Sequence, residues 1–202
     1  MAETQIDIDA LPVGGHSLNL ARHAGFHGVL ALLALALFAA ADSWYTLTGL
    51  ELALGLSVIT GLLAGATIPT LVHEWFHYLG AKFSGGKYSI PKPLGLFVYD
   101  WDFTANSTRQ FFVMSLGGTL GSLVAIIFLF QVLPADTAGR AALLAASVGS
   151  LGFAGAIEWP VLLRTRKSGE PLSELAKVDL DVLRRSAAVG GIVGLVTYNL
   201  IY

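Results

Sequence analysis

The stretch PTLVHEWFHYLGAKFSGG, from Pro69 to Gly86, decides how the rest of this sequence is interpreted. Two histidines and a glutamate, in HEWFH at residues 73–77, lie inside a run that is otherwise apolar. Ionisable side chains are costly in the interior of a membrane, so three of them placed together indicate a functional site.

The composition around this stretch is that of a membrane protein. Of the 202 residues, 54% are hydrophobic and only 13% are charged, and the mean hydropathy is +0.68. The charged fraction is about half of that in typical soluble domains. The chain has no cysteine, so disulfides and thiolate metal ligands are excluded. A net charge of −2 without a basic tract gives no indication of nucleic-acid binding.

The hydrophobic runs predict an all-α polytopic membrane protein with about five spans. A spanning helix needs roughly 20 mostly apolar residues. The expected spans are Gly28–Leu47, Leu52–Phe83, Phe111–Leu133, Ala141–Leu163 and the short Ser186–Tyr202. We therefore expect a polar cytosolic head at residues 1–27 and a single membrane-embedded domain at residues 28–202.

The basic residues predict the orientation of these spans. All of the 12 lysines and arginines except Arg140 fall in the head or in alternate loops, as five spans with an inside N-terminus require. The expected location is a prokaryotic inner membrane, with a cytoplasmic N-terminus and a site that faces the cytoplasm.

The loop between the second and third expected spans has strand character. In KYSIPKPLGLFVYDWDFT, residues 87–104, two prolines oppose a helix and LFVYDWDF alternates in part. The segment is too short to cross the bilayer as a helix. It predicts a short β-hairpin that is interfacial or re-entrant against the protein.

The pentapeptide itself has the pattern HExxH. Residues four apart share one face of a helix, so His73 and His77 can bind one metal ion. Glu74 lies about 100° further round the helix, where it can act as general base rather than as a ligand. Nitrogen and carboxylate ligands favour Zn2+.

A catalytic zinc usually has three protein ligands, so a third must come from elsewhere. Glu158 is an acidic residue within an expected span, where a carboxylate indicates a functional role. It lies six residues before Arg164, about 9 Å along a helix, while His77 and His73 lie about 8 and 14 Å before Lys82. This similar depth favours Glu158. The alternatives left open are Asp100 and Asp102 in the loop, with His16, His23 and His27 as unconstrained donors.

HEWFHYLGAKFSG resembles the motif helix of the site-2 protease family, which are intramembrane zinc metalloproteases. The matching positions are His73, Glu74, His77, Ala81, Lys82 and Gly85. The order of motif helix, strand-bearing loop, glycine-rich helix and acidic helix is also similar. The resemblance implies Zn2+ held by both histidines and an acidic third ligand. In the family that ligand is an aspartate followed by glycine, whereas Glu158 stands in AIEWP.

Two functions follow as hypotheses. The first is an intramembrane zinc endopeptidase that cleaves transmembrane segments of membrane proteins, with Glu74 as catalytic base and His73, His77 and Glu158 as metal ligands. The second is a non-proteolytic membrane protein of the same fold that acts as a binding or regulatory partner. The separation of the Glu158 carboxylate from the two imidazoles tests the proposed ligand set.

Overall fold

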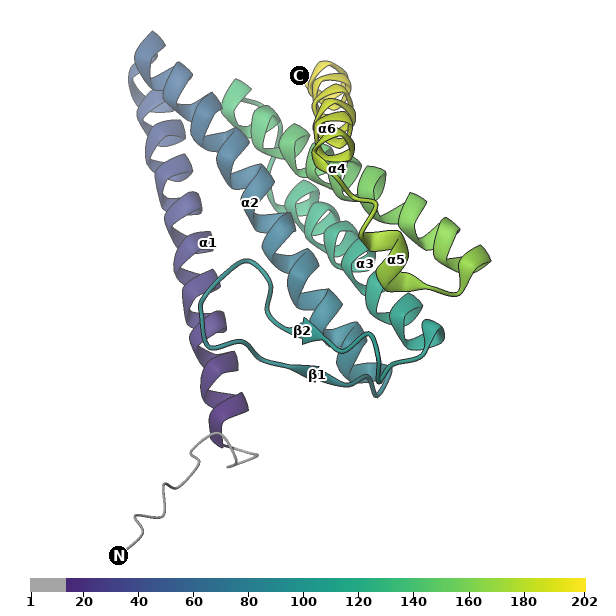
Figure 1. Ribbon diagram of the computed structural model, residues 1–202. Coiled ribbons are helices and arrows are strands. Elements are labelled where there is room, and N and C mark those ends of the chain that lie inside the picture. The colour runs from purple at the N-terminus through teal and green to yellow at the C-terminus, as the bar shows by residue number, and fades with distance from the viewer. Residues whose placement is uncertain (1–13) are drawn as a thin grey trace, which may run out of the picture.

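The computed structural model describes residues 14–202, and most of these are helical. The described part of the predicted polar head is therefore residues 14–27, and residues 1–13 lie outside it. Figure 1 shows a row of long helices with a thin hairpin crossing the lower half of α2. The elements are α1 (Gly14–Thr48), α2 (Glu51–Phe83), β1 (Tyr88–Ser89), β2 (Asp100–Trp101), α3 (Thr108–Val132), α4 (Ala138–Ser168), α5 (Pro171–Leu175) and α6 (Leu180–Ile201).

Four of these helices, α1 to α4, are long and apolar enough to cross a membrane. Many of their large apolar side chains, such as Leu33, Ile59 and Phe128, are exposed on the surface of the protein. A soluble domain would bury such residues, whereas a bilayer solvates them. The predicted fifth span falls in α6, which is not among the four, so five spans stay a prediction.

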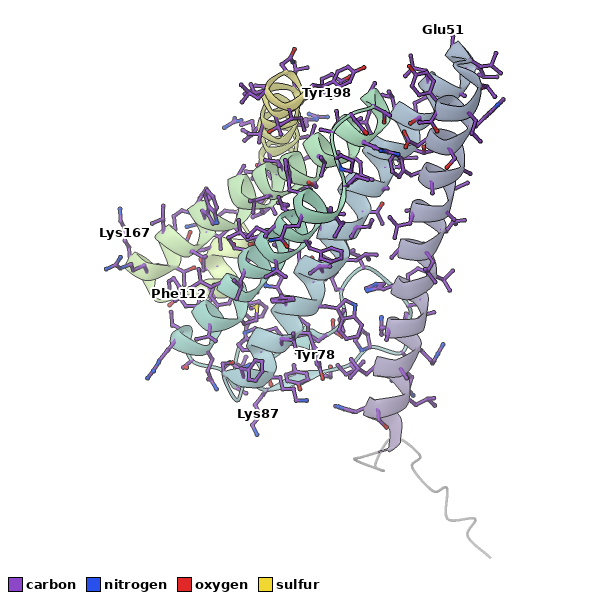
Figure 2. All side chains as sticks on the ribbon, turned by 180° about the vertical axis from the view of Figure 1, so that it is seen from behind. Glu51, Tyr78, Lys87, Phe112, Lys167 and Tyr198 are labelled. Carbon is purple, nitrogen blue, oxygen red and sulfur yellow. The ribbon has the colours of Figure 1, made fainter. Side chains whose placement is uncertain are left out.

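The helix that carries the HExxH motif is α2. Its 33 residues extend about 50 Å, which exceeds the roughly 30 Å of a bilayer core, so it must tilt or project. In Figure 2 its first residue, Glu51, lies at the opposite end of the molecule from Tyr78 and Lys87. The motif is thus near the end of α2 where the hairpin begins.

Small residues set the distances between the helices around α2. A Cβ added to Gly65 would collide with the Leu143 carbonyl of α4, and one added to Gly117 of α3 would collide with the Phe76 carbonyl. Gly149 of α4 likewise lies against Gly190 of α6. Such contacts let helix backbones approach closely in membranes. They form a core of α2, α3 and α4, with α1 and α6 on its two sides (Figure 1).

Local signals define where the core helices begin and end. α3 begins with a capping box, in which Ser107 accepts from the Gln110 backbone and the Gln110 side chain accepts from the Ser107 backbone. α4 begins after the cap Thr137 and ends at Ser168, before Gly169, whose positive φ of 74° suits glycine. These caps fix the start and the end of the helices that carry the candidate site.

The predicted hairpin is present, but its ladder is short. β1 and β2 are antiparallel and have two residues each, with Tyr88 opposite Trp101 and Ser89 opposite Asp100. The chain between them is irregular, because the two prolines, Pro91 and Pro93, cannot extend a ladder. The segment nevertheless packs against the protein, since Ile90 and Val98 are buried.

Two helix boundaries differ from the sequence prediction. α1 begins at Gly14 rather than Gly28, because polar residues in the expected head are buried against the hairpin loop: His23 and His27 lie within hydrogen-bonding distance of the Pro91 and Gly95 carbonyls, at 3.1 and 2.9 Å. α6 begins at Leu180 rather than Ser186, after an Asp179 cap. Residues 14–27 of the expected head thus continue the helix that contains the first expected span.

A buried polar cluster joins three helices at the end opposite the hairpin. Asp42 of α1 accepts hydrogen bonds from Ser57 of α2 at 3.1 Å, from Thr137 at 2.7 Å and from Arg140 of α4 at 2.8 Å. A buried carboxylate is tolerated there because each of its partners is a donor. The cluster explains why Arg140 departs from the charge distribution of the other basic residues.

We expect Asp42→Ala to destabilise the protein by about 1–3 kcal/mol, because it leaves buried donors without an acceptor. The measurement is the thermal unfolding midpoint in detergent. Asp136→Ala is the matched control, since it removes the exposed carboxylate that also binds Arg140 and should cost under about 1 kcal/mol. Equal effects of the two substitutions would contradict a structural role for the cluster.

Candidate metal centre

The motif helix presents its three polar side chains together. Each of His73, Glu74 and His77 offers one ligand atom, and these atoms lie within 4.8 Å of one another. The rings of the two histidines are 4.4 Å apart between centroids and nearly perpendicular. His73 and Glu74 are buried and His77 is partly so. His73 and His77 thus lie side by side on α2, as their four-residue spacing predicts.

Glu158 of α4 reaches the same point from the other side. Its Oε1 lies 2.6 Å from His73 Nε2 and 3.1 Å from His77 Nε2. The structure therefore brings together the three residues that the sequence suggests as metal ligands, and their role as ligands stays a prediction. Glu158 Oε2 is buried and has no hydrogen-bond partner among residues 14–202.

The far nitrogen of each imidazole is held by α3. His77 Nδ1 lies 2.9 Å from the Met114 carbonyl, and His73 Nδ1 lies 3.0 Å from Ser122 Oγ. A carbonyl only accepts, so His77 Nδ1 must carry a hydrogen and donate it. A neutral His77 then turns the lone pair of Nε2 toward the Glu158 carboxylate.

This arrangement requires positive charge between the side chains. Two lone pairs facing one carboxylate oxygen repel each other unless each nitrogen is protonated or a cation is shared. Two Nε2 atoms, a carboxylate oxygen and imidazole Nδ1 atoms tied to supporting groups form the donor set that a divalent metal uses in proteins. The residues present therefore fit Zn2+, with the second Glu158 oxygen unpartnered beside them.

The packing of α3 against the imidazoles depends on one glycine. A Cβ at Gly118 would overlap His77 Cε1 and Nε2 and would approach His73 Cε1 to 2.7 Å. Gly118 lies in SLGGTLGS, a glycine-rich stretch of α3. Which glycine faces the histidines depends on the rotation of α3, which the pattern does not specify.

The cluster opens into a cavity of about 480 Å³. Apolar and aromatic side chains form most of its wall, and they come from three directions: Tyr99, Trp101 and Phe103 from the hairpin, Phe111 and Met114 from α3, and Leu175 and Val178 from α5 and its following turn. The hairpin and α5 thus enclose the same space. Sequence analysis did not predict α5, which is only five residues long.

Glu174 fastens α5 to α4. Its carboxylate is buried and accepts from Arg164 Nε at 2.9 Å and from Lys177 Nζ at 2.7 Å. These bonds, that of Lys177 first, hold the pKa of Glu174 below its ordinary value of 4.5. The attachment is therefore complete at neutral pH and is lost as the pH falls through the lowered value.

The other candidate ligands lie elsewhere. Asp102 accepts hydrogen bonds from the Thr104 hydroxyl and from the Thr104 and Ala105 amides, which lower its pKa and form a turn. Asp100 is exposed in β2. Neither aspartate lines the cavity. Of the head histidines, His16 is exposed, while His23 and His27 contact the hairpin loop.

Trp75 links the motif to this loop. Its indole Nε1–H donates to His27 Nδ1 at 3.0 Å, so His27 Nε2 carries the hydrogen and donates it to the Gly95 carbonyl. Trp75, which occupies the first x of HExxH, thereby helps to hold the hairpin in place through His27. Sequence reasoning missed this role, because no spacing rule connects Trp75 with His27.

We expect Gly118→Ala to weaken zinc binding by the purified protein, because its methyl group would displace both imidazoles. Zinc affinity measured by competition with a chelator checks this. Gly55→Ala is the control on α2, since a Cβ there meets nothing within 4 Å. Unchanged affinity in Gly118→Ala, with helical content preserved in both variants, would contradict the predicted ligand geometry.

We expect Glu174→Gln to open the α5 side of the cavity. Since the chain has no cysteine, Val161→Cys reports access: this position lines the cavity and is 2% exposed. Its labelling by a water-soluble maleimide should become several-fold faster in the Glu174→Gln background. Glu170→Gln, an exposed substitution nearby, is the control. Equal labelling rates of Val161→Cys with and without Glu174→Gln would show that Glu174 does not hold the cavity closed.

No protein-family model, no curated protein and no solved structure matches this chain. The resemblance of the motif helix to the site-2 protease family therefore stays a prediction from the sequence. The case for a function rests on the geometry of the His73, His77 and Glu158 cluster and of the cavity beside it.

Proposed function

We propose that this protein is an intramembrane zinc endopeptidase that cleaves transmembrane segments of membrane proteins. The observation that supports this most strongly is the convergence of His73 Nε2 and His77 Nε2 on Glu158 Oε1, at 2.6 and 3.1 Å. Glu74 lies beside this set, and all four residues line one cavity.

In this proposal, His73, His77 and Glu158 would hold Zn2+. The bound ion would supply Lewis-acid chemistry, activating a water and stabilising negative charge on the substrate. Glu74 takes a proton from the attacking water on its carboxylate and delivers it to the leaving amine. One carbon–oxygen bond forms and the peptide carbon–nitrogen bond breaks, so Glu74 ends in its starting state.

The cavity wall favours an apolar substrate. Its side chains are mainly aromatic and aliphatic, and no lysine or arginine among residues 14–202 lines it. A transmembrane segment would bury its side chains there at little desolvation cost. Its helix must unwind locally first, because intact helix hydrogen bonds shield the peptide carbonyls. The hairpin, which supplies one wall, would contact the unwound segment.

The proposed setting is a prokaryotic inner membrane, with α6 as a fifth span and a cytoplasmic N-terminus. The ends of α2 and α4 that follow the motif and Glu158 carry Lys82, Arg164 and Arg166, and basic residues favour the inside face. The partners are then the lipid bilayer and a transmembrane protein substrate. Nucleic acid is not among the expected partners.

A second candidate function is that of a non-proteolytic binding or regulatory protein with this fold. The separation of 2.6 Å between His73 Nε2 and Glu158 Oε1 favours it, because a protonated imidazole would close this contact without a metal. Protein that carries no zinc after purification and after zinc dialysis would support this candidate.

We expect Glu74→Gln to retain zinc and to lose cleavage by about 10²–10⁴-fold, because the amide cannot accept a proton. The assay is cleavage of a model transmembrane substrate in proteoliposomes, with zinc content measured on the same samples. Glu51→Gln, at the exposed start of α2, is the matched control and should cleave as the unmodified protein does. Equal cleavage by Glu74→Gln would overturn the mechanism.

A further inference from the structure

Tyr99 brings a phenol from the hairpin into the catalytic cavity. It directly precedes β2 and lines the same space as Glu74 and Glu158. The segment from Gly95 to Tyr99 follows the carbonyl that His27 holds, so the position of the phenol is set partly by α1. No metal-ligand or base pattern in the sequence includes this residue.

Aromatic neighbours fix the ring of Tyr99 on the Glu74 side of the site. Its centroid lies 6.0 Å from that of Tyr88, 6.4 Å from that of Tyr78 and 6.5 Å from that of Trp101. Tyr78 is one helical turn after Glu74 and shares its face of α2. Tyr99 therefore packs on a residue that lies one helical turn from the proposed base.

The Tyr99 hydroxyl is the cavity hydroxyl that has no hydrogen-bond partner among residues 14–202. The others are engaged: Thr70 donates to the Ala66 carbonyl at 2.7 Å, Ser122 contacts His73 and Ser115 contacts the Met114 sulfur. An unpartnered donor that faces a substrate cavity is available to a substrate carbonyl.

The phenol also keeps its hydrogen. Burial raises the pKa of Tyr99 well above its ordinary value of 10. Tyr99 is therefore a neutral donor throughout the working pH range. Its donor strength is greatest toward an oxygen that gains negative charge.

We infer that Tyr99 is a catalytic residue whose phenolic O–H donates to the scissile carbonyl oxygen as negative charge develops there. This inference rests on the proposed peptidase function. A fixed donor aimed at the developing charge stabilises the transition state more than the ground state. The hairpin would then supply part of the chemistry as well as a wall of the cavity.

The test compares Tyr99→Phe with Tyr88→Phe, which removes a hydroxyl from the same aromatic cluster outside the cavity. We expect Tyr99→Phe to lower kcat by about 10²-fold, as loss of one oxyanion donor does, with KM and zinc content unchanged. Tyr88→Phe should cleave normally. A second readout is the affinity of the zinc-loaded protein for an apolar peptide hydroxamate, which should fall about 10-fold in Tyr99→Phe alone.

The two readouts separate this inference from the proposed function. Full cleavage by Tyr99→Phe, or equal losses in both variants, overturns the role of Tyr99 and leaves the peptidase intact. Loss of zinc in Tyr99→Phe shows a structural role and also overturns it. If the unmodified protein cleaves nothing, a selective loss of hydroxamate affinity in Tyr99→Phe supports donation to a bound carbonyl, while equal affinities overturn it.

Discussion

The structure depends on the need to place positive charge between two imidazoles and one carboxylate in an apolar interior. His73, His77 and Glu158 meet within 3.1 Å, and the Met114 carbonyl fixes the hydrogen of His77 on its far nitrogen. An isolated carboxylate in such surroundings is very costly, and two neutral imidazoles do not compensate it. A shared divalent cation would satisfy all three side chains at once, which is the basis of the proposed metal site.

The close approach of the helices is a consequence of this constraint. Glu158 reaches the histidines only if α4 packs tightly on α2, and Gly65 against the Leu143 carbonyl provides that contact. α3 must also approach the imidazoles to hold their outer nitrogens, which Gly118 permits and any larger residue would prevent. The small residues of the core therefore serve the site as much as the stability of the bundle. The polar cluster at Asp42 anchors the far end of the same helices.

Much of this arrangement could be predicted from sequence, where a local rule applied. Helical periodicity places His73 and His77 on one face, and counting residues to the interface basic residues places Glu158 at their depth. The supporting contacts were not predictable, because the rotation of α3 about its axis selects Ser122 and Gly118 from several similar residues. His27 was interpreted as part of a polar head, yet tertiary contact with Trp75 and the hairpin buries it. Apolar span counting also misses α5.

The hairpin connects α1 and the motif helix α2 with the cavity. Its loop is held by α1 through His27, and His27 is in turn held by Trp75 inside the motif, so a shift of α1 would move the wall that faces the ligands. On the opposite side, Glu174 holds α5 over the same cavity. The proposed peptide hydrolysis in a bilayer would need both a water at the site and an apolar channel for the substrate. Two elements of different chemistry would meet these needs: an aromatic wall fixed to the motif helix, and a short helix whose ion pairs are partly exposed to water.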